Sequence, residues 1–372
     1  MNLDENVKTR DLLDIPVEMT STRKRTVFVT GANGFIGNAV ARGFARAGWH
    51  SYGLVRSPSS CHSLEREEVI PIVASIDNIS TWEPQLASLP PIDVLISTTD
   101  DLKDYSGHYS NVNRLMRTLA EDSYHKTGQK ALFIYTSGCK DYGMGPHIHG
   151  APNLQPHTEA SPLNPPNFAK ERARCGVEAL QMNDQWDPVV VRPTNVYGRS
   201  ASYFRAFFEV ASHAERTKSP LLLTAPPGNI LHALHVDDCA DAYVAIASHP
   251  IRDDVARQVF NISSERYETL GDIADALVQE YGLEKGPRYI DSAKGEILGE
   301  GEVDPWPAML IDWPQWTGSE KLRRVTGWTD RRMQFGEGIG IYRMGYEAAV
   351  REGDERHNRI KSIVPLLNLT VD

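Results

Sequence analysis

The residues from Gly31 to Gly37 have the types and spacing of a turn that can hold a phosphate group. Glycines stand at Gly31, Gly34 and Gly37, after an apolar run at 26–30 and before an amphipathic run at 36–48. Gly31 allows a tight turn, Gly34 lets the backbone approach a pyrophosphate at a helix N-terminus, and Gly37 allows close packing of helix and strand. The glycine spacing alone is weak evidence, but a strand before it and a helix after it supply the required context. We therefore predict a dinucleotide-binding turn.

The residues after the second expected strand bear on which dinucleotide binds. That strand, 52–55, is followed by Arg56 and Ser57 instead of the acidic residue that would accept the ribose 2′-hydroxyl of NAD. An arginine there can pair with a 2′-phosphate, and Ser57 can add a hydrogen bond. The sequence therefore favours NADP(H), with NAD(H) as the alternative. An ordinary solvated surface arginine is the simpler interpretation of Arg56.

Apolar runs alternate with amphipathic stretches through the first half of the chain. The expected strands are 26–30, 52–55, 69–74, 93–97, 131–136 and one that contains 189–191, and the expected helices are 36–48 and 111–126. This alternation predicts an α/β fold, a Rossmann-type doubly wound parallel sheet with helices on both faces. The later strand-like pieces are 221–224 and 258–262, and the later helix-like runs are 203–217, 270–281 and 335–351. Their irregular order predicts a smaller C-terminal substrate-binding lobe.

The same pattern predicts how the chain divides into parts. We expect a partly disordered N-terminal extension at 1–25 and a dinucleotide-binding domain at 26–198. Residues 199–372 would form mainly the substrate-binding lobe, with strand-like segments of 221–262 partly returning to the first domain. The region 143–166 is rich in Pro, Gly, His and Asn, which predicts a long loop of the kind that is often functional.

Composition argues against several classes of protein. The chain has 372 residues and a net charge of −10, whereas nucleic-acid binding needs a concentrated basic face. No apolar run approaches the ~18 residues of a membrane span, and residues 1–25 lack the features of a secretory signal. The four cysteines are scattered without a C-x-x-C pair, which favours free thiols in the cytoplasm and no zinc site. We expect a small-molecule substrate as partner and leave a homodimer open.

Several segments, in a fixed order, resemble the extended short-chain dehydrogenase/reductase superfamily. This group holds NAD(P)-dependent sugar epimerases, dehydratases, and the 3β-hydroxysteroid dehydrogenase and dihydroflavonol reductase types. The matching segments are the turn at 31–37, the strand-five segment 135–143, the strand-six segment 191–198, the helix start at 235–242 and the Thr-Gly-Trp turn at 326–328. The resemblance covers roughly 26–346, nearly the whole chain. It implies a Rossmann fold, an NAD(P) cofactor and a C-terminal substrate lobe.

The resemblance also implies which residues contact cofactor and substrate. The cofactor set lies in the turn, at strand ends and on one helix, and comprises Gly31, Asn33, Gly34, Phe35, Ile36, Gly37, Arg56, Ser57, Ile76, Thr98, Thr99, Thr136, Arg174 and Pro193. The substrate set comprises Cys139, Lys140 and Asn195. Asn195 follows the sixth strand, where epimerases of the group use an asparagine on the substrate. A turn-stabilising role for Asn195 is an equal alternative.

The catalytic residues that the resemblance implies are largely replaced in this chain. Reductases of the group use a Ser or Thr, a Tyr that is the general acid, and a Lys. Aligned on Tyr142, the hydroxyl position is Gly138. Aligned on Glu178, the Tyr and Lys positions are Lys170 and Arg174. Those two residues are four apart, so they share one helix face, which we expect to point into the cleft.

Three explanations of the replaced residues stay open. In a variant oxidoreductase Lys170 would donate the proton, with a pKa lowered by burial beside Arg174. Tyr142 and Ser137 are alternative donors or ligands of the substrate oxygen, and Arg174 would hold the ribose. The second explanation is a non-redox isomerase, dehydratase or cyclase that uses the same pocket. The third is a dinucleotide sensor without catalysis.

The leading hypothesis is an NADP(H)-dependent oxidoreductase that acts on a carbonyl or alcohol of a medium-sized, largely apolar organic substrate. The aromatic, proline-rich stretch at 305–316 suits an apolar pocket, although packing of an irregular lobe explains it equally well. No basic cluster suited to a nucleotide diphosphate is evident in the sequence. We expect no metal, because the histidines at 147–157 lie in a loop and catalytic zinc ligands are usually fixed on rigid elements.

Overall fold

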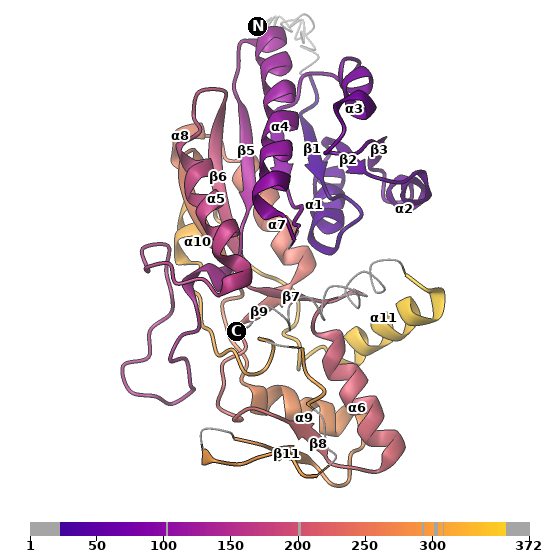
Figure 1. The fold of residues 1–372 in the computed structure, drawn as a ribbon, viewed down its shortest axis with the longest axis vertical. Helices are drawn as coiled ribbons and strands as arrows, with labels where there is room; N and C mark the ends of the chain where they lie inside the picture. The colour runs from indigo at the N-terminus through magenta and orange to yellow at the C-terminus, as the bar shows by residue number, and fades with distance from the viewer. Residues whose placement is uncertain are drawn as a thin grey trace, which may run out of the picture.

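A parallel sheet of seven strands organises the part of the protein that contains the glycine turn (Figure 1). The computed structural model describes residues 23–354 apart from 102, 200–201, 292–293, 301–303 and 308. In spatial order the strands are β10 (Gln258–Ile262), β6 (Trp186–Pro193), β5 (Ala131–Thr136), β4 (Val94–Ser97), β1 (Thr26–Thr30), β2 (His50–Val55) and β3 (Ile70–Val73). The predicted Rossmann-type α/β fold is confirmed, and the six strands expected in the first half are all present.

Alternate side chains of the central strand enter two different cores. Val27 and Val29 of β1 lie in one core, and Phe28 between them lies in the other. The first core packs α1 (Phe35–Arg46), α2 (Cys61–Glu65), α7 (Val236–Ala247), α8 (Arg252–Val255) and α10 (Glu320–Thr326), and the second packs α3 (Ile79–Leu86), α4 (Tyr105–Thr127) and α5 (Lys170–Gln181). Helices on both faces explain why the strand sequences are continuously apolar.

The C-terminal lobe has a separate hydrophobic core, in which aromatic rings pack among aliphatic side chains. It contains α6 (Arg205–Thr217), α9 (Leu270–Tyr281), α11 (Ile339–Glu352) and the parallel pair β8 (Leu221–Leu223) and β11 (Pro287–Tyr289). Figure 1 shows these helices grouped at one end of the molecule, with the pair β7 (Asn195–Tyr197) and β9 (Ala233–His235) between them and the sheet. Trp306 is buried in this core against Phe207, so packing, and not a substrate pocket, explains that tryptophan.

Helix boundaries differ from the sequence prediction where side chains cap the backbone. The helix expected from 111 begins at Tyr105, because Asp104 accepts a hydrogen bond from the amide of Gly107 at 3.0 Å. The last expected helix begins at Ile339 and not at 335. The amides of Phe335 and Gly336 are bound instead by the Glu268 carboxylate, at 2.9 and 2.7 Å.

The long loop at 143–166 is held against the body of the protein. Isolated bridges join Ile148 to Asn229 and His157 to Thr317, and the His147 imidazole is hydrogen-bonded to the carbonyl of Gln155 at 2.9 Å. Within the described residues no three His, Cys, Asp or Glu side chains converge on a point where a metal ion would fit. Nor does the described part contain a helix with the length and apolar character that crossing a membrane requires.

Candidate active site

The turn after β1 has the shape of a phosphate cradle. Gly31 has a φ of +67°, a conformation that side chains other than glycine rarely adopt. The amide of Gly34 donates to the carbonyl of Gly31 at 2.7 Å and closes the turn. A Cβ at Gly37 would overlap the Gly31 carbonyl oxygen and the Thr98 hydroxyl. The N-terminus of α1 therefore stays open, with no side chain capping it, as an anion site requires.

A cavity of about 360 Å³ lies over this turn, at the carboxyl ends of the parallel strands. Ten of the residues predicted to contact the cofactor line it: Gly31, Asn33, Gly34, Phe35, Ile36, Gly37, Arg56, Ile76, Thr98 and Thr99. Ten further residues complete the wall: Leu54, Val55, Ala74, Asp77, Asp100, Asp101, His108, Val196, Ser202 and Tyr203. The carboxyl edge of such a sheet is where Rossmann proteins bind dinucleotides, so the residues present fit that group.

Four members of the predicted cofactor set are absent from the wall of this cavity. Ser57 is engaged in its own turn, where it accepts from the amide of Ser59 at 3.3 Å. The Thr136 hydroxyl is hydrogen-bonded to that of Tyr243, on the α7 side of the sheet, at 2.9 Å. Pro193 is buried at the end of β6. Arg174, the fourth, lies on the surface of α5. Whether such a residue reaches the cavity depends on which face of its strand or helix is turned toward the cavity.

The structure contradicts the expected orientation of Lys170 and Arg174. Lys170 is exposed at the first turn of α5. Arg174 is also exposed and forms ion pairs with Glu171 at 3.0 Å and Glu178 at 2.9 Å. The burial expected for Lys170 is therefore wrong. The predicted proton donor and ribose ligand therefore face away from the cavity.

The inner face of α5 carries Arg172 instead. Its guanidinium pairs with the fully buried Asp141 at 3.0 Å. A Cβ on Gly138 would lie only 3.1 Å from Nη2 of Arg172, so the absence of a side chain at Gly138 leaves room for the guanidinium. One turn later Gly176 packs against Tyr135 and Ser137. The inner side of α5 therefore lies two residues away from the predicted one, which is a rotation of about 200° on a helix.

Ser137 and Tyr142 belong to a buried polar network and do not line the cavity. Ser137 donates a hydrogen bond to Asp141. Tyr142 donates to Oδ1 of Asn261 at 2.7 Å and accepts from Arg192 at 3.0 Å. Both hydroxyls already donate hydrogen bonds to buried protein groups. In this arrangement they therefore do not make the predicted contact with a substrate oxygen.

The three predicted substrate residues are separated in the fold. The Cys139 thiol donates to Oε1 of Gln315 at 2.9 Å. Lys140 is half-buried against the C-terminal segment, where it donates to the carbonyl of Met309 at 2.8 Å and lies over the ring of Trp313. Burial lowers the pKa of Lys140 to about 8. Asn195 is half-buried in β7, one residue before the part of that strand that lines the cavity.

Sequence reasoning missed the polar groups at one end of the cavity. Asp100 follows β4 and lines the cavity with an exposed side chain. Its surroundings raise the pKa of Asp100, although the charges of Arg172 and His108 oppose that rise. Tyr203 comes from the other lobe and lines the same cavity. The doublet Asp100-Asp101 directly after an expected strand was the available sequence signal for the first of these groups.

A glycine turn that opens a helix below a cavity at the carboxyl edge of a parallel sheet defines a dinucleotide-binding Rossmann protein. Sequence comparison narrows this class. The chain belongs to the NAD dependent epimerase/dehydratase family, whose sequence model matches residues 27–263. Members of this family include epimerases, dehydratases and reductases, so an enzyme is the expected kind of protein.

Two named relatives align with most of the chain at low sequence identity. A ceramide reductase of Caulobacter vibrioides is 23% identical over 324 residues, which are 86% of this chain and 91% of the relative. A putative GDP-L-fucose synthase 2 of Arabidopsis thaliana is also 23% identical, over 82% of this chain and 87% of that protein. Their different names leave the substrate of this chain open.

Solved structures of similar shape show the fold. The dTDP-glucose 4,6-dehydratase of Bacillus anthracis in complex with NAD has a TM-score of 0.66 at 16% identity, covering 87% of this chain and 97% of that one. The UDP-glucuronic acid 4-epimerase of Bacillus cereus, also with NAD, has a TM-score of 0.63 at 17% identity, covering 87% and 99%. NAD is bound in both of these solved structures. For this chain the likeness shows the fold.

Proposed function

We propose that this protein is an NADP(H)-dependent oxidoreductase that acts on a carbonyl or alcohol of a medium-sized, largely apolar organic molecule. The observation that carries the proposal is the cavity over the glycine turn, which joins the phosphate cradle to Arg56 at one end and to polar groups at the other. A dinucleotide bound there would supply or accept the hydride. The protein would hold its pyrophosphate at the N-terminus of α1.

The preference for the phosphorylated dinucleotide rests on Arg56. This exposed arginine follows β2 and lines the cavity. Within the described residues its guanidinium has no hydrogen-bond or ion-pair partner. Position 57 is a serine, so no carboxylate follows β2 to accept a ribose 2′-hydroxyl. A guanidinium can bind a phosphate with two hydrogen bonds.

The character of the cavity supports an uncharged substrate. Outside the predicted cofactor set, its wall contains the apolar residues Leu54, Val55, Ala74 and Val196. Among the described residues that line it, Arg56 is the sole lysine or arginine. In the proposed complex that cation would bind the 2′-phosphate of the cofactor. A nucleotide-diphosphate substrate would need a second cationic group. The relative named as a ceramide reductase also supports a lipid-like substrate.

The cofactor preference is tested by calorimetry on Arg56→Asp. We expect the Kd of NADPH to rise roughly 10- to 100-fold, because a charge-assisted contact contributes about 1.5–3 kcal/mol. The Kd of NADH should stay within about twofold, within the scatter of such contributions. Arg324→Asp makes the same charge change on the exposed face of α10 and should alter neither affinity. Equal losses of NADPH binding in both variants would refute the assignment of Arg56.

The redox reaction is tested by NADPH absorbance with decanal, 2-decanone and cyclohexanone as probes. We expect the wild-type protein to consume NADPH with at least one of them.

A second candidate function is a dinucleotide-binding protein without turnover. The observation that favours it is Arg172, which is ion-paired and fills the space in front of Gly138. NADPH binding without consumption across the panel would favour this candidate over the oxidoreductase.

A further inference from the structure

A tyrosine from the C-terminal lobe enters the dinucleotide cavity. Tyr203 lies between β7 and α6 in the sequence, yet it shares the cavity wall with residues at the ends of β1 and β4. It is the one tyrosine among the described residues of that wall. The predicted donors Lys170 and Tyr142 are both absent from the wall, so the proposed reaction needs a different source of its proton.

The order of the strands indicates which half of a dinucleotide Tyr203 would meet. The phosphate cradle follows β1, and Arg56 follows β2 on one side of it. If Arg56 binds the adenosine half, the nicotinamide half must extend to the opposite side, over β4. Asp100 directly follows β4, and Tyr203 lies close enough to Asp100 and Arg172 for their charges to act on its hydroxyl. Tyr203 is therefore placed at the nicotinamide end.

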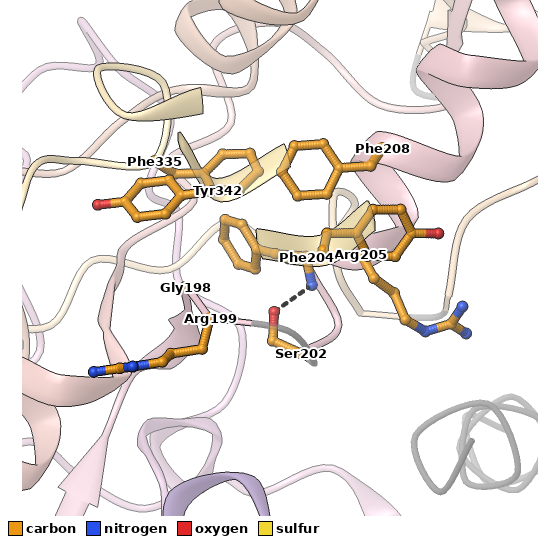
Figure 2. Close-up of a pocket in the computed structure, with 9 residues that line it drawn as sticks. Gly198, Arg199, Ser202, Phe204, Arg205, Phe208, Phe335 and Tyr342 are labelled. Atoms are coloured by element: carbon orange, nitrogen blue, oxygen red, sulfur yellow. Dashed lines mark hydrogen bonds between the residues drawn. The ribbon is translucent and has the colours of Figure 1, made fainter. Parts of the chain in front are cut away.

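Described residues before and after Tyr203 have contacts of their own. Figure 2 shows Ser202 accepting a hydrogen bond from the amide of Phe204, at 3.0 Å. The Phe204 ring packs edge-on against Phe335, with centroids 4.8 Å apart. On the other side Arg199 donates to Asp237 at 2.6 Å. These contacts hold Tyr203 in position without using its hydroxyl.

The charged groups that face Tyr203 come from two elements of the sheet domain. Asp100 follows β4, with Asp101 and His108 behind it, and Arg172 lies on the inner face of α5. Burial and, after it, the negative charge of Asp100 raise the pKa of Tyr203 to about 12, so the hydroxyl is protonated near neutral pH. The positive charge of Arg172 acts in the opposite direction and would stabilise a tyrosinate after the proton has left.

We infer that Tyr203 is the proton donor of the proposed oxidoreductase, an inference that rests on the proposed function. In reduction, hydride from the bound dinucleotide adds to the carbonyl carbon. The π-bond electron pair of the carbonyl moves to its oxygen, and that oxygen takes the proton of the Tyr203 hydroxyl. The tyrosinate, beside Arg172, regains a proton from water. In oxidation the same groups act in the reverse order.

The first test measures turnover in Tyr203→Phe. With the probe carbonyl that the wild-type protein reduces fastest, we expect kcat to fall about 100-fold or more, since a positioned acid contributes roughly 10²–10⁴. The Kd of NADPH should stay within about twofold, because the ring is kept. Tyr289→Phe removes a hydroxyl from a half-buried tyrosine of the same lobe, outside the cavity, and should leave kcat unchanged. Wild-type kcat in Tyr203→Phe would overturn the inference.

The second test needs no substrate. A tyrosinate binds the cationic ring of NADP⁺ more tightly, so bound NADP⁺ should lower the pKa of Tyr203 from about 12 toward its ordinary value of 10.0. The affinity of the wild-type protein for NADP⁺ should then rise about threefold from pH 8 to 10.5. The rise should be absent in Tyr203→Phe and for NADPH, whose ring is neutral. A wild-type affinity that is flat with pH would overturn the placement of Tyr203. Wild-type protein that reduces no probe, but keeps this pH dependence, would instead overturn the proposed function.

Discussion

Glycine and arginine residues determine the local geometry of the candidate site. Gly31 and Gly37 let the chain turn tightly and let α1 approach β1, which leaves the amides of the turn open to an anion. Gly138 has a different role, because the Arg172 guanidinium occupies the space that a side chain at 138 would need. The same residue that departs from the superfamily pattern therefore has a structural reason in this chain.

At this scale we predict that Gly37→Ala destabilises the protein. Its Cβ would overlap backbone and Thr98 atoms that cannot move freely, and overpacking costs roughly 1–3 kcal/mol. Thermal unfolding should show a lower Tm, and calorimetry should show weaker NADPH binding. Gly43→Ala lies in the same helix, and its Cβ would approach no closer than 3.4 Å to Ala240. That variant should be neutral or slightly more stable, and an equal loss in both would contradict the argument from the clash.

The helix α5 shows how an element can be predicted while its rotation is not. Its sequence indicates a helix, and the structure places it at Lys170–Gln181. Arg172 and Gly176 form its inner side, whereas Lys170 and Arg174 are exposed. Both pairs are four residues apart, so spacing alone did not distinguish them. Packing against β5 decides between them, since Gly176 lies against Tyr135 and Ser137 on the inner side of the helix.

At the element scale we predict that Glu268, which binds the segment before α11, makes the stability of the protein depend on pH. Burial raises the pKa of Glu268 to about 7, although the amides of Phe335 and Gly336 favour its charged form. The folded state then binds a proton that the unfolded state releases above about pH 4.5. Stability therefore falls as pH rises from about 4.5 to 7, by up to about 1.4 kcal/mol for each pH unit.

This dependence is measured by urea unfolding of the wild-type protein and Glu268→Gln at several pH values. Glutamine keeps the size and an acceptor oxygen but does not titrate, so the variant should lose less stability than the wild type between pH 5 and 7. Parallel curves for the two proteins would contradict the raised pKa. Glu337→Gln, an exposed neighbour, is the control and should follow the wild type.

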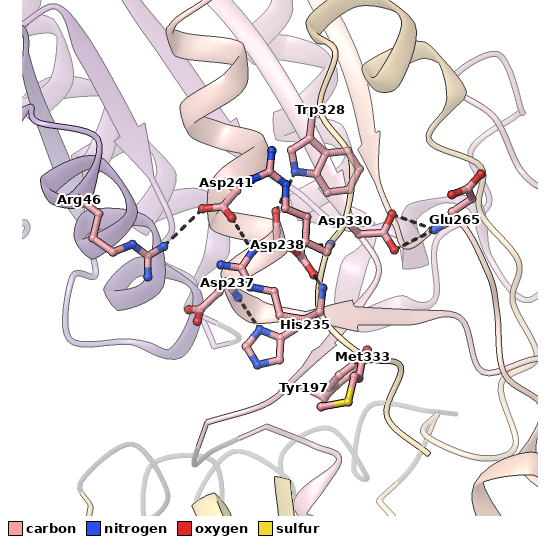
Figure 3. A network of polar contacts seen from close by, with 12 residues as sticks. Arg46, Tyr197, His235, Asp237, Asp238, Asp241, Glu265, Trp328, Asp330 and Met333 are labelled. Atoms are coloured by element: carbon pink, nitrogen blue, oxygen red, sulfur yellow. Dashed lines mark hydrogen bonds and ion pairs between the residues drawn. The ribbon is translucent and has the colours of Figure 1, made fainter. Parts of the chain in front are cut away.

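One carboxylate joins three distant parts of the molecule. Asp237 begins α7, where it forms ion pairs with Arg42 of α1 and with Arg199, which precedes the Tyr203 segment. Figure 3 shows Asp237 beside Asp238 and Asp241, with Arg46 reaching Asp241 from α1. The buried Asp237 carboxylate therefore links the sheet domain to the segment that precedes the proposed donor.

At the scale of the whole molecule we predict a large effect of Asp237→Asn. The Arg42 side chain is 6% exposed and would lose its paired charge, which costs about 3 kcal/mol or more. Asp241→Asn removes a carboxylate that is 36% exposed and should cost under about 1 kcal/mol. Denaturant unfolding distinguishes the two, and equal small losses would contradict this role of Asp237.

Acid unfolding gives a second measure of the same contact. Burial alone raises the pKa of Asp237, but the hydrogen bond from Arg199 and the charge of Arg42 lower it to about 2. The resulting stability is present above about pH 3.8 and is lost as pH falls toward 2. In Asp237→Asn that component of acid unfolding should be absent.

The sequence by itself determined the features that depend on neighbouring residues. The turn at 31–37, the alternation of strands and helices, the parallel sheet and the position of Arg56 after β2 all follow from short stretches of chain. Local spacing of Gly and apolar residues fixes these features because each one is formed within a single strand–turn–helix unit. For that reason the ten turn and strand-end residues predicted for the cofactor lie around one cavity.

Tertiary structure alone decided which polar side chains reach that cavity. Ser137 and Tyr142 turn into a buried network around Asp141 and Arg192, and Tyr203 of the other lobe lines the same cavity as Asp100. These outcomes depend on how a helix rotates on the sheet and how two lobes meet. Such contacts join segments far apart in the chain, and packing, not local spacing, selects among the faces that each element can present.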